Sequence, residues 1–272
     1  MKLGVYLRNM GPASSPDTIT KCALAAERAC LDSLWLADHI AIPPDDAEGS
    51  GGRYLEPLAT LAYLAGLTER IRLGSGVLVL PYRPPLITAK WVATVQELSR
   101  GRLLLGVGLG WMEAEFRAVG ARRGDRGRVS DDTLAFLNRC FADDHAVSNG
   151  QPFLFRPRPA RPPIIVGGSP PHALERAARY GDGWMPMARA PGQLEPAIAE
   201  LGEMFARAGK PAPEIVVLTS LPLDDRVAAT DLARRFAAAG ATTLVHSFRY
   251  QETSEFEAVA ERLGGLAAAG LG

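Results

Sequence analysis

Short apolar runs alternate with amphipathic, helix-like patterns along the whole chain. The runs that are short enough for buried strands cover residues 3–7, 33–37, 71–80, 103–107, 164–166, 183–187, 215–218 and 243–246. Between them, apolar residues recur at spacings of three and four, which is typical of helices packed on one face. These helical patterns cover residues 16–30, 56–67, 86–99, 130–141, 169–180, 192–208, 230–239 and 255–266.

The regular alternation of strands and helices predicts a parallel β-sheet. About eight such units over roughly 250 residues match the size of a (β/α)8 TIM barrel. We therefore expect one TIM-barrel domain over residues 1–272, with a doubly wound open sheet as the alternative. In this scheme the helix at 86–99 packs inward through Ile87, Trp91, Val95 and Leu98.

One segment departs from the simple alternation. An arginine- and glycine-rich connection covers 120–129, and a helix is expected from Ser130 onward. Residues 147–155 then contain Asn149-Gly150, a dipeptide that favours a tight β-hairpin turn.

The amino-acid composition limits the kinds of partner that the protein is expected to bind. The 272 residues carry 30 basic and 30 acidic side chains, and this balance gives no indication of a nucleic-acid or anionic-membrane surface. No apolar run approaches membrane-spanning length. Three cysteines without zinc-ligand spacing predict no metal site, and their odd number suits a reducing cytoplasm. The expected partner is a small-molecule substrate.

The carboxyl ends of barrel strands carry the active sites of TIM-barrel enzymes. The second strand ends in Asp38-His39, so His39 is a candidate acid or base and Asp38 could orient it or bind a cofactor. The alternative is a structural histidine bonded to a backbone carbonyl. His246, which closes the eighth strand, is a weaker candidate.

Alternating glycines end the fourth strand at Gly106, Gly108 and Gly110, and Trp111 follows. Such glycines favour close approach of a ligand to the backbone. The spacing does not match the dinucleotide fingerprint G-x-G-x-x-G, because Trp111 occupies the sixth position counted from Gly106.

Gly167-Gly168-Ser169 follows the fifth strand and opens a helical pattern. Free backbone N–H groups and a hydroxyl at that place suit a phosphate. The alternative is that Ser169 only caps the helix. In the separate connection at 120–129, arginines 122, 123, 126 and 128 form a solvated loop or bind an acidic cofactor tail.

Five segments in this order resemble the luciferase-like monooxygenase superfamily, in particular its coenzyme F420-dependent oxidoreductases. They are SLWLADHI (33–40), RIRLGSGVLVLPYRPP (70–85), GRLLLGVGLGWMEAEFRAVG (101–120), PPIIVGGS (162–169) and AARYGDGW (177–184). The resemblance implies a TIM barrel with a deazaflavin or flavin at the strand ends. It also implies a non-prolyl cis peptide at Gly76-Val77.

The resemblance assigns roles to residues at these strand ends. It implies catalytic roles for His39 and Asp38 and a substrate pocket that includes Trp111 and Leu78. The residues implied to bind the cofactor are Asp38, His39, Gly76, Val77, Val79, Gly108, Leu109, Gly110, Val166, Gly167, Gly168 and Ser169.

Two positions depart from the family pattern. Trp111 stands where sugar-phosphate dehydrogenases of the superfamily have a catalytic glutamate, so their substrate cannot be transferred to this chain. Leu109 stands where flavin-using members often have a phosphate-binding arginine, which favours coenzyme F420 over FMN. We expect hydride transfer between F420 and a small organic substrate, and a homodimer. The alternatives are an FMN-dependent monooxygenase and a non-catalytic flavin- or deazaflavin-binding barrel.

Overall fold

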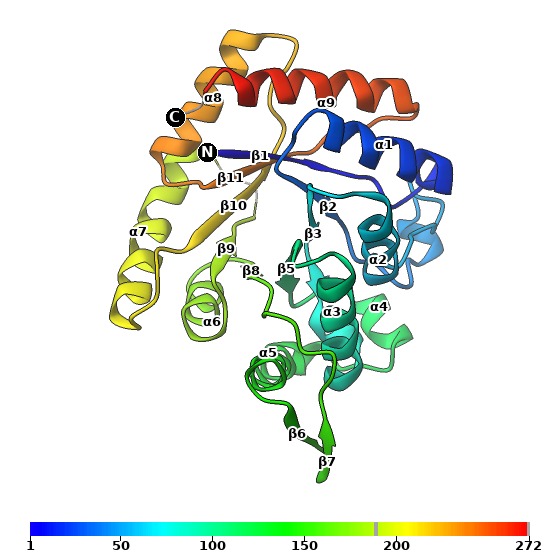
Figure 1. Ribbon diagram of the computed structural model, residues 1–272, viewed down its shortest axis with the longest axis vertical. Coiled ribbons are helices and arrows are strands. Elements are labelled where there is room, and N and C mark those ends of the chain that lie inside the picture. The colour runs from blue at the N-terminus through cyan, green and yellow to red at the C-terminus, as the bar shows by residue number, and fades with distance from the viewer. Residues whose placement is uncertain (188–189, 271–272) are drawn as a thin grey trace.

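The computed structural model describes residues 1–187 and 190–270 and forms a closed parallel β-barrel surrounded by helices (Figure 1). The strand order is β3-β2-β1-β11-β10-β9-β8-β5-β4, and pairing of β3 with β5 closes the barrel. Because β3 and β4 share one place, the barrel has eight positions. The predicted TIM barrel is confirmed.

The barrel strands correspond to the predicted apolar runs, with one interruption. They are β1 (Lys2–Tyr6), β2 (Ser33–Leu36), β3 (Arg72–Ser75), β4 (Leu78–Val79), β5 (Leu103–Gly108), β8 (Ile164–Gly167), β9 (Gly183–Met185), β10 (Glu214–Thr219) and β11 (Thr243–His246). The predicted third strand is divided into β3 and β4 at Gly76-Val77, and the peptide bond between these two residues is cis, as the resemblance implied.

The helices cover the outside of the barrel. They are α1 (Pro16–Arg28), α2 (Pro57–Leu67), α3 (Pro85–Leu98), α4 (Glu113–Ala118), α5 (Arg126–Ala142), α6 (His172–Tyr180), α7 (Pro191–Arg207), α8 (Arg226–Ala238) and α9 (Thr253–Ala268). The hairpin β6 (His145–Ser148) and β7 (Gln151–Leu154) extends beyond α5 (Figure 1), and its turn residues Asn149 and Gly150 both have positive φ, as that turn requires.

Three local expectations were wrong. Helix α5 begins at Arg126 rather than Ser130, so the last four residues of the expected polar connection are helical. Helix α6 begins at His172, and Ser169 is therefore not its cap. Trp91 in α3 is 40% exposed, because the alanines and valines of α3 face the barrel and its larger apolar side chains face outward.

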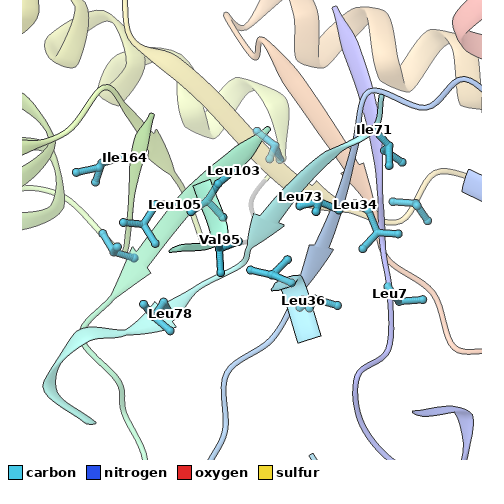
Figure 2. Close-up of a cluster of buried hydrophobic side chains, with 14 of the residues drawn as sticks. Leu7, Leu34, Leu36, Ile71, Leu73, Leu78, Val95, Leu103, Leu105 and Ile164 are labelled. Carbon is cyan, nitrogen blue, oxygen red and sulfur yellow. The ribbon is translucent and has the colours of Figure 1, made fainter. Parts of the chain in front are cut away.

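Two apolar layers hold the barrel together. The larger layer lies between strands and helices, and Figure 2 shows Leu34, Leu73 and Leu105 from neighbouring strands within it. The smaller cluster draws one residue from each of seven strands, which identifies it as the barrel interior. Its members are Tyr6, Trp35, Leu104, Ile165, Met185, Val216 and Val245.

The glycines of β5 fit against the break between β3 and β4. A Cβ atom at Gly106 would lie 2.0 Å from the carbonyl oxygen of Ser75, and one at Gly108 would lie 2.4 Å from a methyl group of Val77. Gly167 faces the same valine, with 2.9 Å between its ideal Cβ and the other methyl group. These glycines therefore make room for the neighbouring strand as well as lining the barrel mouth.

This packing predicts a compensating pair of substitutions. Gly108→Ala should lower the free energy of unfolding by about 2 kcal/mol, because the new methyl group collides with Val77. Adding Val77→Ala removes the colliding atom, so the double variant should lose at least about 1 kcal/mol less than the sum of the single losses. Urea unfolding of all four proteins measures this coupling, and additive losses would contradict the packing account.

Candidate functional site

A cleft of about 610 Å³ opens at the carboxyl ends of the barrel strands. Its size is in the range of small-molecule sites. The structure brings together most of the residues predicted for the site: Asp38, His39, Gly76, Val77, Val79, Gly108, Leu109, Gly110, Trp111, Gly167, Gly168 and Ser169.

The carboxylate of Asp38 is fully engaged within the protein. It forms a two-pronged ion pair with Arg83, with distances of 2.6 and 2.8 Å, and accepts a hydrogen bond of 2.8 Å from the backbone N–H of Val79. Burial acts to lower the pKa of Arg83, but the ion pairs with Asp38 and Glu56 raise it above its ordinary value. Asp38 therefore fixes the segment after the cis peptide, and both of its carboxylate oxygens have partners within the protein.

His39 is held by a second buried carboxylate, Glu115 of α4. The distance from Nδ1 of His39 to Oε2 of Glu115 is 2.8 Å, and the Glu115 side chain is 1% exposed. The other oxygen of Glu115 accepts from the backbone N–H groups of Ile40 and Ala41, and the Tyr82 hydroxyl donates to Oε2. One carboxylate thus joins the end of β2, helix α4 and the turn after β4.

The environment keeps Glu115 ionised. Burial acts to raise its pKa, but hydrogen bonds from the amides of Ala41 and Ile40 and from His39 together hold the pKa below its ordinary value. An ionised carboxylate accepts hydrogen bonds only, so Nδ1 of His39 carries the proton in this contact. The opposite ring nitrogen, Nε2, has no hydrogen-bond partner within the described residues.

Aromatic rings flank His39 on its other sides. The ring of Tyr54 lies 4.9 Å away between centroids, and that of Trp111 lies 6.4 Å away and edge-on. Trp111 is 67% exposed at the rim of the cleft. His39 and Trp111 both line the cleft, so a ligand bound there can contact the imidazole and the indole together.

The far side of the cleft is suited to an anion. Gly168 has a φ of 126°, Ser169 is exposed, and both follow the end of β8. Arg126 and Arg176 line the same end of the cleft. Asp131 is bonded to Arg176, whereas Arg126 donates only to the backbone carbonyl of Arg123 within the described chain. Arg126 is thus a cation that a phosphate or carboxylate could approach.

Three predicted residues lie elsewhere. Val166 and Leu78 are fully buried in the layer between barrel and helices and do not line the cleft; Figure 2 shows Leu78 in that layer. His246 accepts a hydrogen bond from the Leu221 N–H, and burial lowers its pKa to about 4, so it is a neutral structural histidine.

The sequence reasoning missed Glu115, Arg83 and Tyr82. Glu115 lies in the first turn of α4, where a carboxylate is favourable at any helix start, so its position along the chain does not distinguish it as a site residue. Arg83 and Tyr82 lie in the PYRPP segment. Only their buried partners, Asp38 and Glu115, distinguish them as site residues, and the sequence does not show those contacts. Arg126 was included in the basic run, but its place on a helix facing the cleft was not predicted.

Comparisons with known proteins identify the family of the chain. A family model described as luciferase-like monooxygenase matches residues 1–269. An uncharacterized protein of Mycobacterium tuberculosis is 31% identical over 250 residues, 85% of each chain. An F420-dependent hydroxymycolic acid dehydrogenase of the same species is 31% identical over 188 residues, 64% of this chain and 49% of the relative.

Solved structures show the same fold at lower identity. The monooxygenase RslO1 from Streptomyces bottropensis has a TM-score of 0.80 at 19% identity, covering 99% of both chains. An F420-dependent secondary alcohol dehydrogenase, solved with an F420–acetone adduct, has a TM-score of 0.80 at 17% identity, covering 98% of both. The chain belongs to the luciferase-like monooxygenase family.

Residues 1–187 and 190–270 contain no cluster of three potential metal ligands among histidine, cysteine, aspartate and glutamate side chains. The same residues contain no helix of sufficient length and hydropathy to cross a membrane.

The Glu115 contacts predict a specific pH dependence of stability. Because the pKa is lower in the folded protein than in the unfolded chain, the carboxylate stabilises the fold above about pH 4.5, and this contribution is lost as the pH falls through the lowered folded value. Glu115→Gln should lower the free energy of unfolding at pH 7 by about 3 kcal/mol and reduce the further loss on acidification. Denaturant unfolding at pH 7 and pH 4 measures both.

The neighbouring Glu113 provides a matched control, since its side chain is 54% exposed and lies 3.7 Å from Arg123. Glu113→Gln should leave stability within about 0.5 kcal/mol of the parent protein at both pH values. An acid-induced loss in Glu115→Gln as large as in the parent would contradict the role given to this carboxylate.

Proposed function

We propose that this member of the luciferase-like monooxygenase family is a coenzyme F420-dependent oxidoreductase that transfers a hydride between the deazaflavin and a small organic substrate. The observation that carries the proposal is the division of the cleft. The floor of the cleft at Gly76-Val77 and Gly108 is apolar. One end carries the glycine N–H groups and Arg126, which has no carboxylate partner among the described residues. The other end carries the His39 imidazole, hydrogen-bonded to Glu115.

The choice of F420 over FMN rests on two observations. Leu109 lines the cleft at the position where an arginine would hold the flavin phosphate, so the chain lacks that contact. One of the two M. tuberculosis relatives with 31% identity, matched over 188 residues, is an F420-dependent hydroxymycolic acid dehydrogenase. The deazaflavin, when bound, would supply hydride chemistry at its reactive ring carbon.

The chain's own residues would hold the cofactor at two places. The N–H groups of Gly168 and Ser169, together with Arg126, would bind its acidic tail. Gly76, Val77 and Gly108 would support the flat ring without polar side chains. The fit is supported by the cleft lining, where Gly76, Gly108 and Gly168 present backbone rather than side chains to a ligand.

His39 would donate or accept the proton that accompanies hydride transfer. Glu115 fixes the proton on Nδ1 and compensates positive charge on the ring, so Nε2 is the nitrogen that can hold or accept a proton on the cleft side. Trp111 would cover this position and exclude water from it. His39 would thus be a proton carrier in a chain that has Trp111 at the position of the catalytic glutamate expected in the superfamily's sugar-phosphate dehydrogenases.

Titration of the purified protein with F420 and with FMN tests the cofactor. We expect a saturable change in deazaflavin absorbance and fluorescence at one site per chain, and no comparable response to FMN. Arg126→Gln should weaken F420 binding about tenfold by removing one charged contact, whereas Arg123→Gln should have little effect, since that side chain is half exposed and lies near Glu113. Tight FMN binding without a deazaflavin response would overturn the F420 proposal.

The same protein then tests turnover. Reduced F420 is mixed with enones, imines and ketones, and its oxidation is followed optically. At F420 concentrations that saturate the variant, His39→Ala should lose more than about 100-fold in rate. Its melting temperature should also fall, because buried Glu115 loses one of its four donors, so the rate is measured at a temperature where the variant is folded. Unchanged rates would remove His39 from the mechanism, and no oxidation with any acceptor would favour the non-catalytic cofactor-binding alternative.

We also propose that the chain forms a homodimer through α2 and α3. Ile87, Trp91 and Leu98 are 40–56% exposed along α3, and Tyr63 on the adjacent α2 is 47% exposed. Apolar side chains gathered on one face favour association. Light scattering should give twice the chain mass, and Trp91→Glu should give a folded monomer; a monomeric parent protein would contradict the proposal.

A further inference from the structure

One side of the cleft is lined by apolar side chains alone. Strands β9 and β10 and the residues directly after β9 contribute four lining residues, which we call the apolar wall: Met185, Pro186, Met187 and Leu218. The lining after β2 includes Asp38 and His39, and the lining after β8 includes Ser169. Among residues 1–187 and 190–270, the β9 and β10 side of the cleft thus offers a ligand no charged, hydroxyl or amide side chain.

The apolar wall continues the packing of the barrel interior up to the rim. Met185 belongs to the interior cluster, and Leu218 is partly buried and packs against that cluster. Met187 is 65% exposed. A ligand that covers an exposed apolar side chain gains free energy from its burial, and the unbranched methionine side chain adapts to ligands of different shape. The wall therefore has a fixed lower part and an adaptable rim.

The charged groups that line the rest of the cleft are largely compensated. Asp38 and Arg176 each form an ion pair with another side chain, and Glu115 accepts four hydrogen bonds. Arg126 has no carboxylate partner in the described part of the chain, and the proposed acidic cofactor tail would meet it. With that tail bound, a charged substrate gains no counter-ion from these lining residues.

The apolar wall and His39 lie at different sides of the barrel mouth. In the ring of strands, β1 and β11 separate β2 from β10, so His39 and Leu218 lie at the ends of strands three places apart. Ala37 and Val77 line the same cleft and, like Leu218, pack against the interior cluster. The cleft is therefore apolar along its floor as well as at the wall. A molecule that reacts beside His39 and also contacts the wall extends across the mouth.

We propose that Met187 and Leu218 determine substrate specificity, and that the substrate is an uncharged carbonyl compound, or the corresponding alcohol, with an apolar chain or ring that reaches the apolar wall. The proposal rests on the proposed function for the chemistry beside His39. In reduction, the carbonyl carbon takes the hydride of the reduced deazaflavin and the oxygen takes a proton, which gives the alcohol; oxidation reverses both transfers. A charged or polyhydroxylated chain would lose its hydration against the wall and gain no partner there.

The test compares three methyl ketones by calorimetry, with the full-length protein free and saturated with oxidised F420. 2-Butanone and 2-octanone differ only in chain length, and 7-oxooctanoate differs from 2-octanone only in its terminal carboxylate. With F420 bound, the parent protein should bind 2-octanone at least about tenfold more tightly than either of the other two. The reason is that the added methylene groups lie against the wall, whereas a carboxylate there would be desolvated.

Substitutions in the apolar wall test whether these residues cause the preference. Met187→Ser and Leu218→Ser should each reduce the preference for 2-octanone over 2-butanone at least about threefold, and Met187→Leu should retain it. Val147→Ser removes an exposed apolar side chain from the β6–β7 hairpin, outside the cleft, and should leave the preference unchanged. Because Met187 is largely exposed, Met187→Ser should fold like the parent protein, and melting curves check this for Leu218→Ser.

Several outcomes would overturn the proposal. These are equal affinities for 2-butanone and 2-octanone, tighter binding of 7-oxooctanoate than of 2-octanone, or a preference that survives both serine substitutions. A fall in F420 affinity in these variants, with the ketone preference intact, would assign the wall to the cofactor. F420 binding without measurable binding of any ketone would reject the substrate class and leave the cofactor standing. Failure of F420 to bind, with a wall-dependent preference in the free protein, would reject the cofactor and leave this site standing.

Discussion

The hydrogen-bonded carboxylate of Glu115 is the interaction on which the mouth of the barrel depends. A buried negative charge is tolerated only when donors surround it, and Glu115 has four, from His39, Ile40, Ala41 and Tyr82. These donors come from the loop after β2 and the turn after β4, while Glu115 itself comes from α4. The charge therefore fixes three separate segments relative to one another, and His39 receives its orientation as one consequence.

A second carboxylate, Asp38, organises the adjoining segment through Arg83 and the Val79 amide. Together the two acids leave the cleft with a rigid, apolar floor and few free charges. Within residues 1–187 and 190–270, Arg126 lines the cleft without a carboxylate partner. Arg126 is therefore the charge that the proposed acidic cofactor tail would meet.

The fold and the residues at the strand ends could be predicted from the sequence because the signals for them are local. The apolar runs, the turn at Asn149-Gly150 and the glycines of β5 each depend on nearby residues. Glu115 could not be identified in this way, because its partner His39 is 76 residues away and becomes a neighbour only when the barrel closes. Trp91 was misplaced for a related reason: helical periodicity marks an apolar stripe but does not distinguish a stripe that faces the barrel from one that faces outward.

Hydrogen–deuterium exchange of the protein with and without F420 tests the central claim most directly, since it locates the bound molecule on the chain. The account predicts slower exchange in residues 37–41, 76–83, 108–111 and 167–176, with no change in the β6–β7 hairpin. Protection confined to α8 and α9, or no protection at saturating F420, would contradict a deazaflavin site at the mouth of the barrel.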